Sequence, residues 1–221
     1  MSRSITVDWA GEALELRAER ALRLPEHDTL LVADLHLGKA RSFRQQGLPV
    51  PAGTTSDTLG RLDALLAAAP ARRIVFLGDL LHSRHAQGSP ALDALAAWRA
   101  RHPALALVLV RGNHDAHAGD PPPALGIESV DEPWPIGALA LCHRPQPPRR
   151  PARGVIAGHL HPGLALHGRG GDRLRLPCFH IGPDIAVLPA FGAFTGLHLV
   201  RPSPGDRAWV VADGALHAAA G

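Results

Sequence analysis

The feature that most constrains the fold of this 221-residue chain is a short apolar segment that runs directly into side chains able to bind a metal. The clearest example is the run 105–110, which has no charged residue and leads into Gly112-Asn113-His114-Asp115. A continuous apolar run of this length is typical of a strand covered on both faces. Gly112 allows a sharp turn after the strand. Taken alone, the four residues are also an ordinary polar turn.

The same arrangement occurs four more times along the chain. Apolar segments also end at Asp34 and His36, at Asp79, at His143, and at His159 and His161. Open α/β folds place their sites at the carboxyl ends of strands. In Asp-x-His and His-x-His, both side chains point the same way along an extended segment, so each pair can bind one ion. Any one of these motifs, taken alone, can occur by chance. All five in this order favour a metal site.

The pattern between these motifs indicates a layered α/β or α+β protein. We predict short antiparallel strands within 5–24, strands at 29–33, 74–77, 105–110, 136–141 and 155–157, and helices from about 54 to 69 and 89 to 101. Thr54 or Thr55 can cap the first helix. We expect an ordered loop or short helix at 38–53, an irregular Pro-rich segment at 116–135, and strands and turns from 163 onward.

Composition limits the class of protein. With 46% hydrophobic and 19% charged residues, the chain can bury a sizeable core, and we expect one domain over residues 1–221. No apolar run is long enough to cross a membrane, and the N-terminus lacks the apolar stretch of a signal peptide. Cys142 and Cys178 show no framework spacing, which suits a reducing cytoplasm. The net charge of +3 permits a polyanionic partner without requiring one.

The motifs together resemble the calcineurin-like metallophosphoesterase superfamily. The series is Asp34-x-His36, Gly78-Asp79, Gly112-Asn113-His114-Asp115, His143 and Gly158-His159-x-His161. The longer strings 34–40 and 78–83 resemble the bacterial ligase-associated branch, which is encoded beside a DNA ligase and a helicase and described as a DNA-damage-response endonuclease. The resemblance implies a four-layer αββα sandwich of the α+β class with a two-metal site.

The resemblance also implies a ligand set. One metal would be held by Asp34, His36, Asp79 and His161, and the second by Asp79, Asn113, His143 and His159, so that Asp79 bridges the two ions. A carboxylate can span two metals about 3.5–4 Å apart. The mixture of imidazole, carboxylate and amide oxygen favours manganese, with iron or zinc as alternatives.

The mechanism expected from these residues is attack on phosphorus by a hydroxide that bridges the metals. His114 would stabilise the developing charge or protonate the leaving oxygen. Asp115 would hold the imidazole of His114 in orientation. His82 follows the strand that ends at Asp79, and it is either a substrate contact or an ordinary part-buried histidine.

The substrate is less well defined by the sequence. Lys39, Arg41 and Arg44 follow the first ligand pair, and Arg149, Arg150 and Arg153 follow His143, so we expect both loops to overhang the metals and contact phosphate, although solvated surface arginines are the alternative. Aromatic residues make up 4% of the chain, which argues against an extensive platform for stacking bases. We expect a DNA endonuclease of DNA repair, partnered by a ligase and helicase if it follows the branch it resembles. The alternatives are the same chemistry on a small nucleotide or lipid pyrophosphate, and a non-catalytic scaffold, which would be expected to lose ligands.

Overall fold

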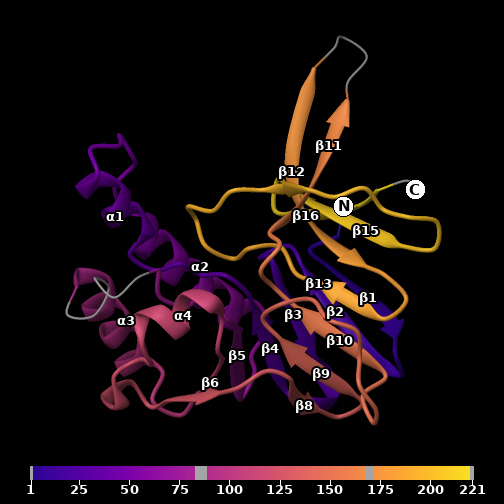
Figure 1. The fold of residues 1–221 in the computed structure, drawn as a ribbon, viewed down its shortest axis with the longest axis horizontal. Helices are drawn as coiled ribbons and strands as arrows, with labels where there is room; N and C mark the ends of the chain where they lie inside the picture. Colours follow the sequence, from indigo (N-terminus) through magenta and orange to yellow (C-terminus); the bar gives the residue numbers. More distant parts are fainter. Residues whose placement is uncertain (1, 83–88, 168–171, 220–221) are drawn as a thin grey trace.

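Two β-sheets packed face to face form the body of the protein in a computed structural model that describes residues 2–82, 89–167 and 172–219 (Figure 1). The first sheet has seven strands in chain order. They are β1 (Ser4–Trp9), β2 (Glu12–Arg17), β3 (Ala21–Leu24), β4 (Thr29–Val32), β5 (Arg73–Leu77), β6 (Ala106–Val110) and β7 (Ile127–Val130). Strands β1 to β4 are antiparallel neighbours, whereas β4 to β7 run parallel.

The second sheet is formed by the rest of the chain. Its strands are β8 (Trp134–Ile136), β9 (Leu139–Cys142), β10 (Gly154–Ala157), β11 (Pro162–His167), β12 (Arg173–Ile181), β13 (Ile185–Val187), β14 (His198–Leu199), β15 (Arg207–Ala212) and β16 (Ala215–Ala219). Strands β9, β10 and β13 are parallel neighbours. The β11 and β12 ends of this sheet project from the body (Figure 1).

The helices lie on one side of the paired sheets. They are α1 (Lys39–Gln45), α2 (Thr54–Ala68), α3 (Pro90–Arg101) and α4 (Asn113–Ala118). The structure also has the 3-10 turns η1 (Pro25–His27) and η3 (Pro123–Leu125). Leu62 of α2 and Trp98 of α3 are buried in the same cluster as Phe76 of β5, so α2 and α3 cover the outer face of the first sheet. Within the described residues no helix follows Leu125 (Figure 1). The predicted α+β class with two packed sheets is thus confirmed, with α2 and α3 over the first sheet.

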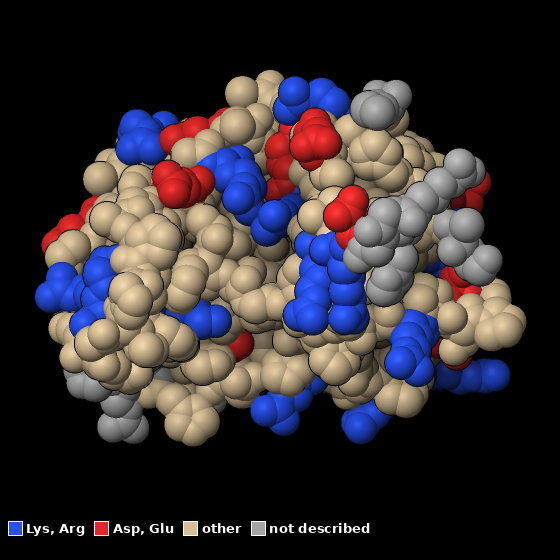
Figure 2. Space-filling model, turned by 90° about the horizontal axis from the view of Figure 1, so that it is seen from above, with Lys and Arg blue, Asp and Glu red and all other residues tan. Residues whose placement is uncertain are grey.

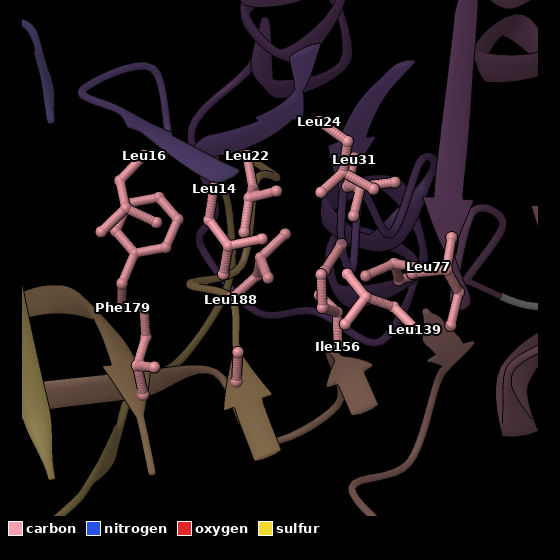
Figure 3. Close-up of a cluster of buried hydrophobic side chains, with 14 of the residues drawn as sticks. Leu14, Leu16, Leu22, Leu24, Leu31, Leu77, Leu139, Ile156, Phe179 and Leu188 are labelled. Atoms are coloured by element: carbon pink, nitrogen blue, oxygen red, sulfur yellow. The ribbon is translucent and has the colours of Figure 1, made fainter. Parts of the chain in front are cut away.

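Apolar side chains from both sheets meet in the space between them (Figure 3). Leu14, Leu31 and Leu77 come from the first sheet, and Ile156 and Phe179 face them from the second. All five are at most 1% exposed. Burying a leucine or phenylalanine side chain stabilises a fold by about 1.5–3 kcal/mol, so this layer holds the sheets together.

Most of the predicted elements are confirmed, and three are corrected. The predicted strand 136–141 is broken by Gly137, whose φ of 54° turns the chain back between β8 and β9. The segment 116–135, expected to be irregular, contains β7 and the start of β8. The N-cap of α2 is Gly53 rather than Thr54 or Thr55, and no side chain caps it.

The arrangement brings the carboxyl ends of strands from both sheets together. A parallel bridge joins Ala33, just after β4, to Ala190 in the second half of the chain. The loop after β4 is also tied to the loop after β5, because His36 N–H donates to the carbonyl of Asp79 at 2.8 Å. Side chains of the loops that follow β4, β5, β6, β9 and β10 can therefore meet at this edge. No helix of the described residues is both long and apolar enough to cross a membrane.

Candidate metal centre

Five loops converge at the shared edge of the two sheets, as the sequence pattern predicts. They leave the carboxyl ends of β4, β5, β6, β9 and β10. Their histidine nitrogens and carboxylate oxygens gather in three groups, each with all donor atoms within 4.8 Å of one another. The groups are Asp34–His36–His161, Asp79–His143–His159 and His36–His82–His114. The first two are subsets of the two ligand sets that the family resemblance implies.

The first group surrounds a carboxylate oxygen that lacks a partner. Asp34 is fully buried, and its Oδ1 has no hydrogen-bond donor among the described residues. His161 Nε2 lies 3.6 Å from this oxygen, and His36 Nε2 lies 3.4 Å from His161 Nε2. A buried unpaired carboxylate oxygen is costly. A divalent cation between the oxygen and the two imidazoles would satisfy it, so these residues fit a metal.

The second group is oriented by a backbone carbonyl. His143 Nδ1 lies 3.0 Å from the carbonyl oxygen of Leu77, which can only accept, so Nδ1 carries the proton. His143 Nε2 then carries a lone pair that can bind a metal, and Asn113 Oδ1 and His159 Nδ1 each lie 3.0 Å from it. Fixing one ring nitrogen by a carbonyl is the usual way in which a metal-binding histidine is held.

Asp79 lies between the two groups. Its Oδ2 is 3.8 Å from His36 Nε2, and its Oδ1 is 3.5 Å from His143 Nε2. The two oxygens of one carboxylate therefore face different groups. This geometry suits the bridging position that the resemblance implies for Asp79.

The backbone of these loops is conformationally unusual. Asp34, His36, Asp79, His159 and His161 all adopt positive φ, between 47° and 69°. Non-glycine residues in this left-handed region cost roughly 1–2 kcal/mol each. Clustering of such residues is typical of functional sites. Gly78 is required before Asp79 because its φ is 77° and an added Cβ would overlap the ring of His143.

The role expected for Asp115 is corrected by the structure. Its carboxylate is buried and accepts backbone N–H groups of Gly112, Asp79, Leu80 and Leu81, at 2.9, 2.6, 3.0 and 3.4 Å. It does not orient the His114 ring, whose Nδ1 instead lies 3.0 Å from the carbonyl oxygen of His82. Burial raises the pKa of Asp115, opposed by the backbone hydrogen bonds. Asp115 therefore fixes the loop that carries Asp79.

His114 stands at the rim of the centre. Its side chain is 39% exposed, and Nε2 lies 4.0 Å from Asp79 Oδ2. His82 stacks against it with ring centroids 5.1 Å apart. Burial, followed by the charges of His114 and Lys39, lowers the pKa of His82 to about 4. Burial, and then Lys39, lowers the pKa of His36 to about 2, so His36 is a neutral imidazole available as a ligand.

Arg41 and Arg44 line a hollow beside α1. Arg44 Nη1 donates to the carbonyl of Pro51 at 2.8 Å, and both arginines line a hollow of about 570 Å³ together with the first residues of α2 and α3. No member of the three donor groups lines this hollow in the described part of the chain. The side of α1 near the ligands carries Lys39 and Phe43, which are one helical turn apart.

The expected position of Arg149 and Arg150 is wrong. Because β9 and β10 are parallel, the loop that leaves the metal edge at His143 must return to the amino end of β10. Ala152 N–H bonds to the carbonyl of Arg149 at 3.0 Å, and Arg153 N–H bonds to that of Ala138, before β9, at 2.8 Å. The two arginines therefore precede the amino end of the strand. Over the face seen in Figure 2, basic side chains are dispersed, with acidic ones among them.

Comparisons with known proteins identify the family of the chain. The family model of calcineurin-like phosphoesterases matches residues 28–184, and the chain belongs to this family. Its members use divalent metal ions, and the three donor groups provide residues able to bind them. The string 78–83, which resembles the bacterial ligase-associated branch, ends at Ser83. This residue lies outside the described residues.

Among solved structures, the Pseudomonas putida nuclease MPE is 43% identical, with a TM-score of 0.85 over 98% of this chain and 100% of that chain. A protein of unknown function from Aquifex aeolicus, AQ665, is 20% identical with a TM-score of 0.41, over 65% of this chain and 81% of that chain. The E. coli phosphoesterase Yfce is 15% identical with a TM-score of 0.40, over 84% of this chain and 88% of that chain. These two are too different to inform the site. The search of curated proteins gave no match.

Proposed function

We propose that the protein is a phosphodiesterase that requires two divalent metal ions and cleaves DNA. The observation that carries the proposal is the pair of donor groups joined through Asp79, with the exposed imidazole of His114 beside them. Two adjoining cation sites that share one carboxylate are typical of enzymes that displace an oxygen at phosphorus. The similarity to a nuclease supports nucleic acid as the substrate.

The chain's residues divide into ligands and a proton donor. Asp34, His36, Asp79 and His161 would hold one ion, and Asp79, Asn113, His143 and His159 the other. When bound, the ions supply Lewis acidity toward the phosphate and an activated water for attack. Asp34 and Asp79 neutralise only half of the four positive charges, and the remainder suits a phosphodiester anion.

His114 would assist the leaving oxygen. Its Nδ1 pairs with a carbonyl that accepts, so Nδ1 holds a proton and Nε2 is directed toward the centre. As an imidazolium, His114 can donate from Nε2 to the departing oxygen or stabilise its charge. Its exposure leaves room for a substrate to reach it.

Finer parts of the proposal come from the resemblance and the donor chemistry. Mixed nitrogen and oxygen donors favour manganese, with iron or zinc as alternatives. A role in DNA repair, a cytoplasmic location and association with a DNA ligase or helicase follow from the branch that the sequence resembles.

The test is cleavage of plasmid DNA with Mn²⁺, together with turnover of a nitrophenyl diester and a nitrophenyl monoester. We expect nicking and a clear preference for the diester. The Asp79→Asn variant, purified in the same way, controls for contaminating nuclease. If wild type never cuts DNA while a nucleotide or lipid pyrophosphate is hydrolysed quickly, the small-molecule alternative replaces the DNA proposal.

A further inference from the structure

Helix α1 presents one cation and one aromatic ring on the side nearest the metal centre. It begins three residues after His36, and Lys39 and Phe43 lie one turn apart on the same face. Lys39 is the only lysine among the 23 lysines and arginines of the chain. Arg41 and Arg44 of the same helix line the separate hollow described above.

The ammonium of Lys39 is half-buried and lacks an anionic partner in direct contact. No hydrogen bond or ion pair joins its side chain to any described residue. Burial lowers the pKa of Lys39, and the more distant charges of Asp34 and Asp79 oppose the shift. Those two carboxylates are candidate metal ligands. With cations bound to them, the ammonium would have no counter-charge in the protein.

Aromatic rings hold this side of α1 against the site. The Phe43 ring lies 5.7 Å from that of Phe194 in an edge-to-face arrangement and 6.1 Å from that of His82. Lys39 Nζ lies 6.0 Å from the centre of the Phe43 ring. His82 in turn stacks on His114, the candidate proton donor. Lys39 is thus connected through packed rings to the residue expected to act at the leaving oxygen.

We infer that Lys39 is a substrate-binding residue whose ammonium contacts a non-bridging oxygen of the phosphate held at the metal centre. The inference rests on the proposed phosphoesterase function. A half-buried cation beside a site for divalent ions is favourable only if an anion joins them, and phosphate is the anion that such a centre handles. Preorganised cations aimed at a phosphoryl group also stabilise the charge that builds up during transfer.

The proposed contact predicts how activity should fall when Lys39 is replaced. The pattern differs from that expected for an arginine that contacts DNA far from the metal centre. A contact to the reacting phosphate is made by every phosphate ester, so a small diester and DNA should lose equally when Lys39 is replaced. A contact to a neighbouring backbone phosphate would affect DNA alone.

The experiment compares Lys39→Met and Lys39→Arg with Arg72→Met in the metal-loaded protein. Arg72 is a matched control because its side chain is 90% exposed before the amino end of β5, away from the centre, and its loss changes the net charge equally. Three quantities are measured: metal content, the affinity for inorganic phosphate by calorimetry, and kcat/KM on a nitrophenyl diester and on DNA. A charge-assisted hydrogen bond lost from a bound phosphate corresponds to about 10- to 100-fold.

We expect Lys39→Met to keep both metals but to lose about 10- to 100-fold in phosphate affinity and in kcat/KM on both substrates. Lys39→Arg should recover part of both, and Arg72→Met should resemble wild type. Unchanged phosphate affinity in a folded, metal-replete Lys39→Met protein would overturn the inference. So would a loss of metal that Lys39→Arg does not repair. Because phosphate binding is measured without turnover, a wild-type protein that fails to cleave diesters would count against the proposed function alone.

Discussion

The two sheets contribute different chemistry to the candidate metal centre. The loops of the first sheet provide both carboxylates, Asp34 and Asp79, whereas those of the second provide imidazoles, at His143, His159 and His161. The first sheet is also the one covered by α2 and α3. The first half of the molecule therefore supplies both carboxylates together with His36, and the second half adds further nitrogen donors to them.

The most direct way to test this division is to remove a charge from the first half. Asp79→Asn should lower activity by at least about 10³-fold and deplete both metals, because the two oxygens of Asp79 face both donor groups. Metal analysis of the purified variant measures the depletion. His159→Ala is the matched change in the second half and should affect one ion only. Two ions at full occupancy in Asp79→Asn would disprove the bridging position.

His114→Ala separates the chemical step from metal binding. It should retain both metals and lose on the order of 10²–10⁴ in rate on DNA, the usual contribution of a general acid. A nitrophenyl leaving group needs no proton, so turnover of a nitrophenyl diester should suffer less. Parallel rate measurements on the two substrates give the comparison. Equal losses would leave charge stabilisation as the role of His114.

Asp115→Asn tests what fixes the loop of the first sheet that carries Asp79. An amide cannot accept all four backbone N–H groups that the buried carboxylate satisfies, so the free energy of unfolding should fall by about 2 kcal/mol or more. Urea unfolding measures the change. Asp8→Asn, on the exposed face of β1, removes the same charge and should have little effect. Similar losses in the two variants would indicate a general charge effect instead.

The smallest effect is expected within the helical layer formed by α2 and α3 over the first sheet. Asp63 of α2 accepts hydrogen bonds from Trp98, Arg101 and His102 at the end of α3, each at 2.8 Å. Burial acts to raise the pKa of Asp63, but these hydrogen bonds outweigh it, so the pKa is lowered. The stabilisation is therefore complete above the ordinary carboxyl pKa of about 4 and disappears as the pH falls through the lower folded-state value.

Asp63→Asn should therefore cost less than about 1 kcal/mol at pH 7, since the Asp63 side chain is 38% exposed, and the difference from wild type should vanish in acid. Urea unfolding of both proteins at pH 7 and near pH 2 gives the two differences. A difference that persists at low pH would mean that Asp63 acts through packing.

Local pattern predicted most of this architecture and the convergence of the candidate ligands. The strands before Asp34, Asp79 and His143 were evident because an apolar run followed by a turn residue is a local signal. The bonds that Asp115 accepts from Asp79, Leu80 and Leu81 were not evident, because these residues lie in a loop some 35 positions earlier in the chain. The position of Arg149 was also mispredicted, since it depends on β9 and β10 running parallel. Phe43 and Phe194 are 151 positions apart, and nothing local signals their contact. That one domain spans residues 1–221 stays a prediction.

The hydrogen bonds that join the two halves of the site have a consequence for how the chain folds. Asp34 Oδ2 accepts the N–H of His159, 125 residues away, and His143 is fixed by the carbonyl of Leu77, 66 residues away. Contacts of such long sequence separation form late, because closing the intervening loop must precede them. Metal affinity should then appear only in the last kinetic phase of refolding. By linkage, a chelator should accelerate amide hydrogen exchange first where β4 and β10 end, before the interior of either sheet is affected.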